Sequence, residues 1–398
     1  MAKQNKPAIR FKGFTDAWEQ RKLGEILQER NTRTSDFESN PLYSLTIESG
    51  VTPKTDRYER SSLVTKTEDL FKTVKPNEFV TNPMNLRFGA LGYNKNAFTV
   101  SVSGYYDVFS IDDDKCSGFW NAYFKTPTAM NIFDNAATGS LIEKRRVKYS
   151  TLQQLAFYMP NDLSEKAEIG KYMDTFDHLI TLHQRKFDKL QVLKKAMFEK
   201  MFPKNGSSVP EIRFKGFTDA WEQRKLGEIA TFINGRAYSQ PELLSSGKYK
   251  VLRVGNFYTN DSWYYSDLEL GEKYYADYGD LLYTWSATFG PHIWLGDRVI
   301  YHYHIWKINL SDQLEKQFAV QLLEQDRTNI LSSKNGSTMV HITKEGMEQK
   351  DVIIPPSTKE QQEIGAFFLQ LDNLITLHQR ELEKLQNIKK SMLEKMFV

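Results

Sequence analysis

The chain has 398 residues, of which 40% are hydrophobic and 26% charged, and its formal net charge at pH 7 is +3. This length predicts two or three domains with sizeable cores, and a nearly neutral chain needs local basic patches to bind phosphate. The single cysteine, Cys116, excludes a disulfide framework, and no stretch approaches the roughly 18 apolar residues of a membrane span. No apolar run follows Met1, so we expect a cytoplasmic protein with no membrane partner.

Two segments of the chain occur twice. Arg10–Ile26 is identical to Arg213–Ile229, an offset of 203 residues, and Leu179–Arg185 is identical to Leu374–Arg380, an offset of 195. Such identity shows an internal duplication, so each half consists of a lead segment, a variable region and a repeated helical segment. The duplication predicts a pseudo-twofold molecule in which the end of the second helix, at Phe397, lies beside Arg10.

The domain boundaries follow from these repeats and from a linker rich in proline, glycine and serine. In chain order we expect a lead segment with the first module at 1–160, a long helix at 161–202, a linker at 203–212, the repeated lead segment with the second module at 213–356, and a second long helix at 357–398.

The two variable regions share almost no sequence, yet both contain short runs of β-branched and aromatic residues separated by Gly, Asn and Asp, which predict strands. We expect helices at Ser117–Lys125 and Gln317–Asp326. Each region is therefore predicted to be a compact α/β (α+β) module with a curved sheet. The clearest predicted strands are Ala97–Val102, Asp107–Ile111, Lys250–Val254, Asp280–Trp285 and Arg298–Ile308.

The two helical segments carry apolar residues at a strict seven-residue spacing, which predicts an antiparallel coiled coil between them. The alternative is an ordinary amphipathic helix packed on each module. His183 and His378 occupy the same heptad position, where a polar residue would fix the register, and Leu193 and Leu374 are expected to widen the seam. The predicted seam consists of Ile169, Phe176, His183, Leu190, Met197, Ile364, Leu371, His378, Leu385 and Met392.

The chain lacks the sequence signatures of catalysis. It has no phosphate-binding loop and no dinucleotide-binding glycine motif, and Asn82-Pro83-Met84-Asn85 imitates the Asn-Pro-Pro-aromatic string of amino-methyltransferases only poorly. His302 and His304 would lie on one strand face, where they could ligate a metal, but no partner ligand is evident and a hydrogen-bonding role is favoured. We therefore expect no catalytic residue, metal or cofactor in this chain.

Polar and basic residues in glycine-flanked loops are the candidate nucleic-acid contacts. Arg and Lys neutralise phosphates, whereas Asn, Ser and Arg also read base edges. Each of these residues alone could be an ordinary solvated side chain of a loop. The whole set therefore indicates a nucleic-acid contact better than any single member does. The candidates in the first region are Asn82, Asn85, Arg87, Tyr93, Asn94, Lys95, Lys144, Arg145, Arg146 and Lys148. Those in the second are Asn234, Arg236, Arg253, Asn256, Tyr258, Trp285, Ser286, Thr288, Lys334, Asn335, Ser337 and Thr338.

This combination resembles the specificity subunit of type I restriction–modification systems. The resemblance rests on the two variable modules, the repeated helices and the lead string that ends Trp-Glu-Gln-Arg-Lys-Leu-Gly-Glu-Ile. It also rests on the segment that opens the second helix, Pro356–Ile364, and on its looser counterpart, Pro160–Ile169. The resemblance covers nearly the whole chain.

The resemblance implies that each module is a target recognition domain that reads one half of a bipartite, asymmetric site in double-stranded DNA. The coiled coil would set the spacer between the halves. Two modification subunits would dock on the chain and methylate adenine with S-adenosylmethionine, and two restriction subunits would add cleavage that uses ATP and Mg. The chain itself would be a non-catalytic component of host defence. The alternatives are a stand-alone DNA methyltransferase and a coiled-coil scaffold that presents two protein-binding modules.

Overall fold

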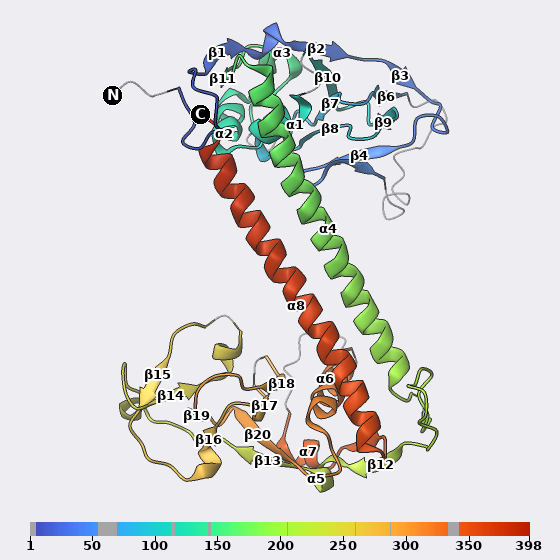
Figure 1. Ribbon diagram of the computed structural model, residues 1–398, viewed down its shortest axis with the longest axis vertical. Helices are drawn as coiled ribbons and strands as arrows, with labels where there is room; N and C mark the ends of the chain where they lie inside the picture. Colours follow the sequence, from blue (N-terminus) through green and yellow to red (C-terminus); the bar gives the residue numbers. More distant parts are fainter. Residues whose placement is uncertain are drawn as a thin grey trace. The chain divides into compact units, whose positions relative to one another are not determined.

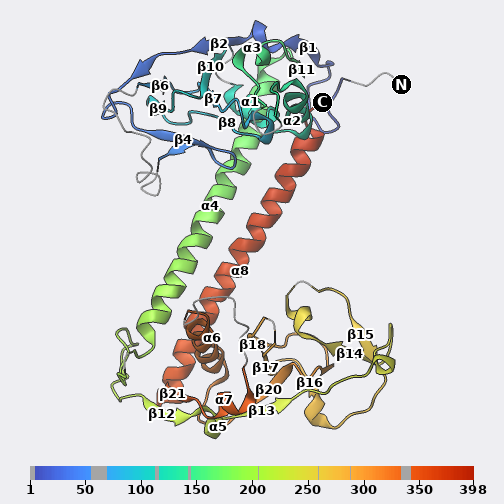
Figure 2. The ribbon, with the colours of Figure 1, turned by 180° about the vertical axis from the view of Figure 1, so that it is seen from behind.

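The computed structural model describes residues 5–54, 70–112, 116–141, 145–204, 206–258, 260–286, 288–332 and 342–398. The chain divides into two compact units, the first made of Met1–Arg185 with Gln379–Val398 and the second of Lys186–His378. Each unit therefore contains one module and a part of both long helices, α4 and α8 (Figures 1 and 2). No helix among the described residues is long and apolar enough to cross a membrane.

The first unit begins with the lead segment. Its module follows and ends where a 39-residue helix begins. Its elements are β1 (Glu19–Lys22), β2 (Leu27–Arg30), β3 (Arg33–Thr34), β4 (Tyr43–Thr46), β5 (Gly50–Pro53), β6 (Phe71–Val74), β7 (Phe79–Thr81), β8 (Leu91–Tyr93), β9 (Val100–Val102), β10 (Asp107–Ile111), α1 (Ser117–Tyr123), α2 (Pro127–Ala136), α3 (Tyr149–Leu152), β11 (Ala156–Met159) and α4 (Leu163–Met201).

The second half of the chain has a similar order, in which a lead-segment strand, a module and a final strand precede the long helix. Its elements are β12 (Glu222–Lys225), α5 (Leu226–Ile229), β13 (Ala230–Asn234), β14 (Tyr249–Leu252), β15 (Tyr264–Ser266), β16 (Tyr275–Ala276), β17 (Leu281–Thr284), β18 (Gly290–Ile293), β19 (Val299–Tyr301), β20 (Ile305–Leu310), α6 (Lys316–Ser332), α7 (Lys344–Glu348), β21 (Asp351–Ile354) and α8 (Thr358–Lys395). The two long helices and both predicted shorter helices are confirmed.

One four-stranded sheet has the same strand order in both modules although their sequences differ, whereas the remaining strands form β3-β6-β9 and β4-β5 in the first module and β15-β14-β19-β16 in the second. The first has an antiparallel sheet in the order β2-β10-β7-β8, and the second has one in the order β13-β20-β17-β18. In each half a strand of the lead segment pairs with the strand that precedes the long helix, β1 with β11 and β12 with β21. The predicted mixed α/β modules are therefore confirmed, and the duplication persists in the fold where it is no longer visible in the sequence.

The equivalence of the two sheets extends to single residues. Thr81 and Thr284 end β7 and β17, and they pair with Asp107 and Ile305, the first residues of β10 and β20. Each threonine also donates its hydroxyl at 3.3 Å to a backbone carbonyl on the far side of the following hairpin. These two threonines therefore give a common register for comparing the modules.

A buried carboxylate at the start of each long helix holds the lead segment in place. Glu165 accepts from Arg10 Nε at 2.6 Å and from Trp18 Nε1 at 3.3 Å, and only 1% of its side chain is exposed. The equivalent contacts in the second half join Arg213, Trp221 and Glu360. Because a buried charge is tolerated only when it is paired, the repeated lead string and the start of the helix form one structural unit.

The helices run antiparallel within each unit. In the first unit the N-terminal part of α4 lies beside the C-terminal part of α8, where Lys389 forms an ion pair with Asp177. The end of α8 also meets the first lead segment: Ile9 N donates to Lys395 O at 2.9 Å, and the rings of Trp18 and Phe397 lie 6.2 Å apart. The predicted proximity of Phe397 to the region of Arg10 is thereby confirmed.

The second unit contains the equivalent antiparallel pairing. Lys194 donates to Asp372 at 2.5 Å, and the rings of Phe198 and Phe368 lie 4.3 Å apart. Of the predicted seam, Ile169, Ile364 and Leu371 are buried and the other seven positions are half-buried.

Two residues expected to widen the seam do not do so. Leu193 is 41% exposed and Leu374 is 44% exposed, because only a narrow stripe of each helix is covered. The register role of His183 and His378 stays a prediction.

Each module packs on its long helix through a close helix crossing. A Cβ atom at Gly170 of α4 would lie 2.6 Å from Phe119 N of α1, and one at Gly365 of α8 would lie 2.7 Å from Phe318 N of α6. Such distances are shorter than van der Waals contact, so only glycine permits this approach. The two glycines are equivalent in the helical repeat.

The predicted strand Arg298–Ile308 is wrong as a single element. It consists of β19 and β20, which belong to different sheets and are separated by the turn 302–304. Ile305 N donates to His302 O at 2.9 Å and closes this turn. His302 and His304 therefore lie on a turn rather than on one face of a strand.

Candidate nucleic-acid interface

Part of the candidate set in the first module gathers at one end of its four-stranded sheet. β7 ends at Thr81 opposite Asp107, so the loop between β7 and β8 and the turn between β9 and β10 share this end. The loop carries Asn82, Asn85 and Arg87, and it begins with a turn in which Asn82 Oδ1 accepts from the backbone N of Met84 at 3.0 Å. Self-capped asparagine turns of this kind hold a loop in a defined shape.

The basic segment 145–148 lies against the same loop. Val147 N donates to Pro83 O at 2.9 Å, which joins two groups that are some sixty positions apart in sequence. Arg87 and Arg145 both face Asp134, with nitrogen to oxygen distances of 3.0 and 3.8 Å. The structure therefore brings together the predicted loop and the predicted basic cluster.

Arg146 and Lys148 are the exposed cations of this segment. Because the carboxylate of Asp134 offsets the charge of its two arginine partners, these exposed side chains are the better candidates for phosphate contact. Lys144 lies outside the described residues.

Three other candidates lie at the opposite end of the sheet, and two of them, Tyr93 and Lys95, contact α4. Tyr93 donates its hydroxyl to Asp174 at 3.0 Å, and Lys95 binds the same carboxylate at 2.7 Å. Burial, reinforced by Asp174, raises the pKa of Tyr93. Asn94 is buried, and its amide nitrogen donates to two backbone carbonyls. Tyr93 and Lys95 therefore support the module on its helix, and Asn94 holds the segment after β8 against the end of β6.

The sequence did not indicate Lys125, which follows α1 and is half-buried near the carboxylate of Asp177. Burial lowers the pKa of this lysine to about 8. No motif marks Lys125 in the sequence, since its environment is made by residues about fifty positions later in the chain.

In the second module the loop between β17 and β18 occupies the equivalent sheet end. Trp285 Nε1 donates to Tyr303 O at 2.9 Å, and the Trp285 ring lies 5.0 Å from that of His304. The hairpin loop therefore packs directly on the turn between β19 and β20. Ser286 is half-buried in this loop and Thr288 is exposed.

Tyr258 belongs to the same surface through His292, a residue of β18. The Tyr258 hydroxyl lies 3.2 Å from His292 Nε2, and the His292 ring stacks on Phe257 at 4.1 Å. Burial lowers the pKa of His292 to about 4, so the imidazole is neutral at physiological pH. Tyr258 is 44% exposed and is thus available for an outside partner.

Two further candidates in this module are engaged within the protein. Asn256 donates its amide to two backbone carbonyls and accepts from Arg253 N at 3.0 Å, which shapes its own loop. Arg236 forms an ion pair with Glu242 at 2.6 Å and holds the pKa of that carboxyl at about 2.

The remaining candidates of the second module are placed as follows. Asn234 is exposed at the end of β13. The Arg253 guanidinium lies 4.3 Å from the centre of the Tyr264 ring. Lys334, Asn335, Ser337 and Thr338 lie outside the described residues.

The histidine pair of the turn is held by internal contacts. The rings of His302 and His304 lie 4.9 Å apart, and His302 Nδ1 accepts from His304 N at 3.5 Å. Burial lowers the pKa of both, that of His302 to about 4. Among the described residues, no three His, Cys, Asp or Glu side chains gather into a metal-binding group.

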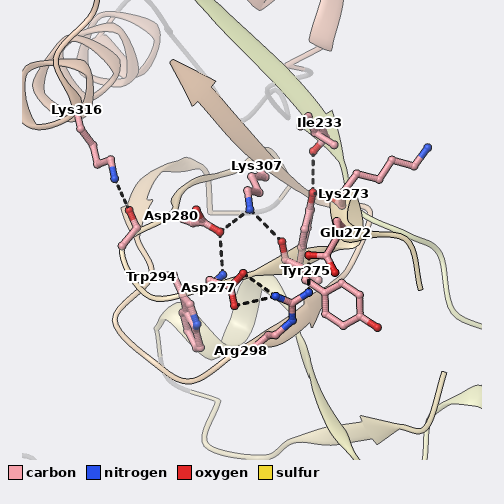
Figure 3. Close-up of polar contacts among 12 residues, drawn as sticks. Ile233, Glu272, Lys273, Tyr275, Asp277, Asp280, Trp294, Arg298, Lys307 and Lys316 are labelled. Atoms are coloured by element: carbon pink, nitrogen blue, oxygen red, sulfur yellow. Dashed lines mark hydrogen bonds and ion pairs between the residues drawn. The ribbon is translucent and has the colours of Figure 1, made fainter. Parts of the chain in front are cut away.

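The opposite end of the second module's sheet carries several ion pairs. Lys307 Nζ donates to Asp280 Oδ2 at 2.6 Å, and Arg298 binds Asp277 at 3.0 Å and Glu272 at 2.6 Å (Figure 3). These carboxylates and cations neutralise one another and brace the turns at this end. Because these charges are already paired within the module, the end that carries Trp285 is the better candidate for a nucleic acid.

The chain is similar in sequence to known specificity subunits. Residues 218–387 match the family model of the type I restriction modification DNA specificity domain. The chain is 24% identical over 252 residues to the type I restriction enzyme MjaVIII specificity subunit of Methanocaldococcus jannaschii. It is 23% identical over 275 residues to the putative type I restriction enzyme MjaX specificity subunit of the same organism. These alignments cover 58% and 66% of this chain but only 59% and 63% of the two relatives, less than two thirds of each.

A solved structure shows the same fold. The crystal structure of the type I restriction–modification S subunit from M. genitalium matches with a TM-score of 0.66 over 99% of both chains at 13% identity. The chain therefore has the fold of a two-module specificity subunit. In sequence the chain is similar to specificity subunits of type I restriction–modification systems, which agrees with the resemblance seen in the sequence.

Proposed function

We propose that this chain recognises DNA for a type I restriction–modification complex and that each module reads one half of a bipartite, asymmetric site. The observation that carries the proposal is the four-stranded sheet of equal strand order that two modules of unrelated sequence share. Each places a polar hairpin loop, β7–β8 or β17–β18, at the same end of the same sheet. Two modules that read different half-sites need the same supporting sheet and different residues in their loops.

The loop residues fit the two kinds of DNA contact. Asn82 and Asn85 carry the amide groups that pair with adenine edges, whereas Arg146 and Lys148 supply exposed charge for phosphates. In the second module, Thr288 and Tyr258 are exposed at the equivalent end, and the Tyr258 hydroxyl lies 3.2 Å from His292 Nε2. Phosphate contacts would fix the position of each module, and the loop side chains would discriminate the bases.

The long helices suit a role as a spacer between the two readers. α4 has 39 residues and α8 has 38, so each spans roughly 57–59 Å at about 1.5 Å per residue. Neither contains proline, and the same antiparallel ion pair occurs once in each unit. A breaker-free pair of this length would hold the two half-sites at a set separation.

In this proposal the chain carries no catalytic residue, metal or cofactor. Two modification subunits that use S-adenosylmethionine would methylate adenine, and two restriction subunits would use ATP and Mg to cleave DNA. The repeated lead segments and helices would present one equivalent docking surface in each half for the modification subunits. The chain's contribution would be recognition and assembly.

Methylome mapping tests the proposal. We expect a host that carries this chain with its modification subunits to methylate adenines in one bipartite sequence, and a host without this chain to lose that methylation. Two further results would favour other functions. Binding of S-adenosylmethionine by the isolated chain would indicate a stand-alone methyltransferase. A footprint without sequence preference would indicate a scaffold.

A further inference from the structure

Two tyrosines occupy the same position in the two modules although the surrounding sequences differ. Tyr105 lies two residues before Asp107, and Tyr303 lies two residues before Ile305. Asp107 and Ile305 are themselves equivalent, because they pair with Thr81 and Thr284. The turn that joins the two sheets of each module therefore carries a tyrosine at one matched place.

Both tyrosine side chains reach the surface. Tyr105 is 89% exposed, and no ring contact to it is formed among the described residues. Tyr303 is 39% exposed and packs on His302 and His304, with ring centroids 4.4 and 4.0 Å away. An exposed aromatic ring gives the fold little stability, so its recurrence in two diverged modules indicates a partner outside the chain.

The surroundings of the first turn favour an anionic partner. Neither the turns, 103–106 and 302–304, nor the adjacent hairpin loops, 82–90 and 285–289, contain an aspartate or glutamate. A Cβ atom at Gly104 would lie 3.1 Å from an Arg33 guanidinium nitrogen, so a cation flanks the first turn. At the second turn, Tyr303 N donates to the backbone O of Arg236 at 3.1 Å, and the guanidinium of Arg236 is paired with Glu242.

The turns lie at the sheet ends that carry the proposed reading loops. In the second module the contact is direct, since Trp285 donates its indole N–H to Tyr303 O at 2.9 Å. In the first module Thr81, which begins the hairpin loop, pairs with Asp107, which ends the turn. A DNA groove that meets either hairpin loop would thus meet the neighbouring tyrosine.

We propose that Tyr105 and Tyr303 are equivalent DNA contacts, in which each ring lies against a base or deoxyribose beside the half-site read by its own module. The inference rests on the proposed function, because it assumes that these sheet ends face DNA. An uncharged ring adds stacking and apolar contact without adding phosphate neutralisation. The tyrosines would therefore strengthen binding independently of salt.

The test uses the full chain assembled with its modification subunits and a duplex that carries the mapped methylation sequence. Affinity is measured over a range of salt concentrations for Tyr105→Ala, Tyr105→Phe, Tyr303→Ala and Tyr303→Phe. Tyr278→Ala is the matched control, because Tyr278 is 74% exposed and lies before β17, at the opposite end of the same sheet. Thermal unfolding of each variant shows whether the fold is retained. The Tyr105 variants test the inference without disturbing the packing of Tyr303 on His302 and His304.

We expect each alanine variant to bind about tenfold more weakly, the size typical of losing one aromatic contact to a base, with an unchanged salt slope. The phenylalanine variants and Tyr278→Ala should stay within about twofold of the wild type. Alanine variants that bind like the wild type, phenylalanine variants that lose as much, or an equal loss in Tyr278→Ala would each overturn the inference. If the unmodified complex shows no preference for its mapped sequence, the proposed function itself fails, which is a separate result.

Discussion

Lys194 of α4 donates to Asp372 of α8 at 2.5 Å, and Lys389 and Asp177 form the equivalent ion pair in the other unit. Each residue maps onto its counterpart through the offset of 195 residues between the helical repeats. The duplicated chain therefore uses one charge pattern twice, with aspartate and lysine exchanged between the two helices. This pairing is specific for antiparallel helices in the observed register.

These ion pairs should contribute modestly to stability. Asp372→Asn should lower the free energy of unfolding by about 0.5–1 kcal/mol, because the Asp372 side chain is 38% exposed and solvent screens the pair. The exchange Lys194→Asp with Asp372→Lys should recover most of this loss. Denaturant titration of both variants measures these changes in the free energy of unfolding. Glu269→Gln, which breaks an exposed ion pair with Lys248, is the control and should leave stability unchanged.

Gly365 should be intolerant of any side chain. Gly365→Ala would place a Cβ atom 2.7 Å from Phe318 N and should destabilise the second unit by about 1–3 kcal/mol through overpacking. Gly271→Ala is the matched control, since nothing lies within 4 Å of a Cβ at Gly271 and its φ of −67° suits alanine. Equal melting temperatures for the two variants would show that α6 and α8 do not cross as closely as described.

The second module should lose stability in mild acid. Burial holds the pKa of His292 at about 4, below the unfolded value of 6.5, so the unfolded chain binds the proton more readily. Neutral His292 contributes fully to the free energy of unfolding above pH 6.5. This contribution, roughly 3 kcal/mol at most, is lost as the pH falls toward 4. Urea unfolding at pH 7 and pH 5 measures the loss. His292→Gln should reduce this pH dependence, of which His302 and His304 retain a part, whereas His178→Gln, at an exposed position, should leave it unchanged.

Lengthening both long helices should change the DNA spacer. Seven residues inserted into each helix preserve the heptad and add about 10 Å, or about three base pairs of rise. We expect methylome mapping to show the same half-site sequences with a longer gap. An unchanged gap accompanied by reduced methylation would make the helices a brace for partner subunits instead.

The repeats and heptads made much of this fold predictable from sequence. Helix bounds followed from periodicity, and the proximity of Phe397 to the first lead segment followed from duplication alone. The contacts of Glu165 with Arg10 and Trp18 were not predictable, because nothing local distinguishes a buried paired glutamate from an exposed one. The prediction of one strand over Arg298–Ile308 was wrong for a related reason, because a short turn of aromatic and histidine residues has the same composition as a strand.

The candidate site was predictable only in part. Asn82 and Arg146 are far apart in sequence, and no periodicity shows that one lies beside the other. Tyr93 and Lys95 follow the loop closely in sequence, yet β8 carries them to the opposite end of the sheet. Strand pairing, which depends on the whole module, determines which polar residues share a surface.

Exchange of one module tests the central claim most directly. The region 27–160 is replaced by the corresponding module of another specificity subunit, and methylated adenines are mapped in a host that also carries the modification subunits. Independent reading predicts that one half of the bipartite sequence changes while the other half and the spacer stay the same. A change in both halves would contradict the account.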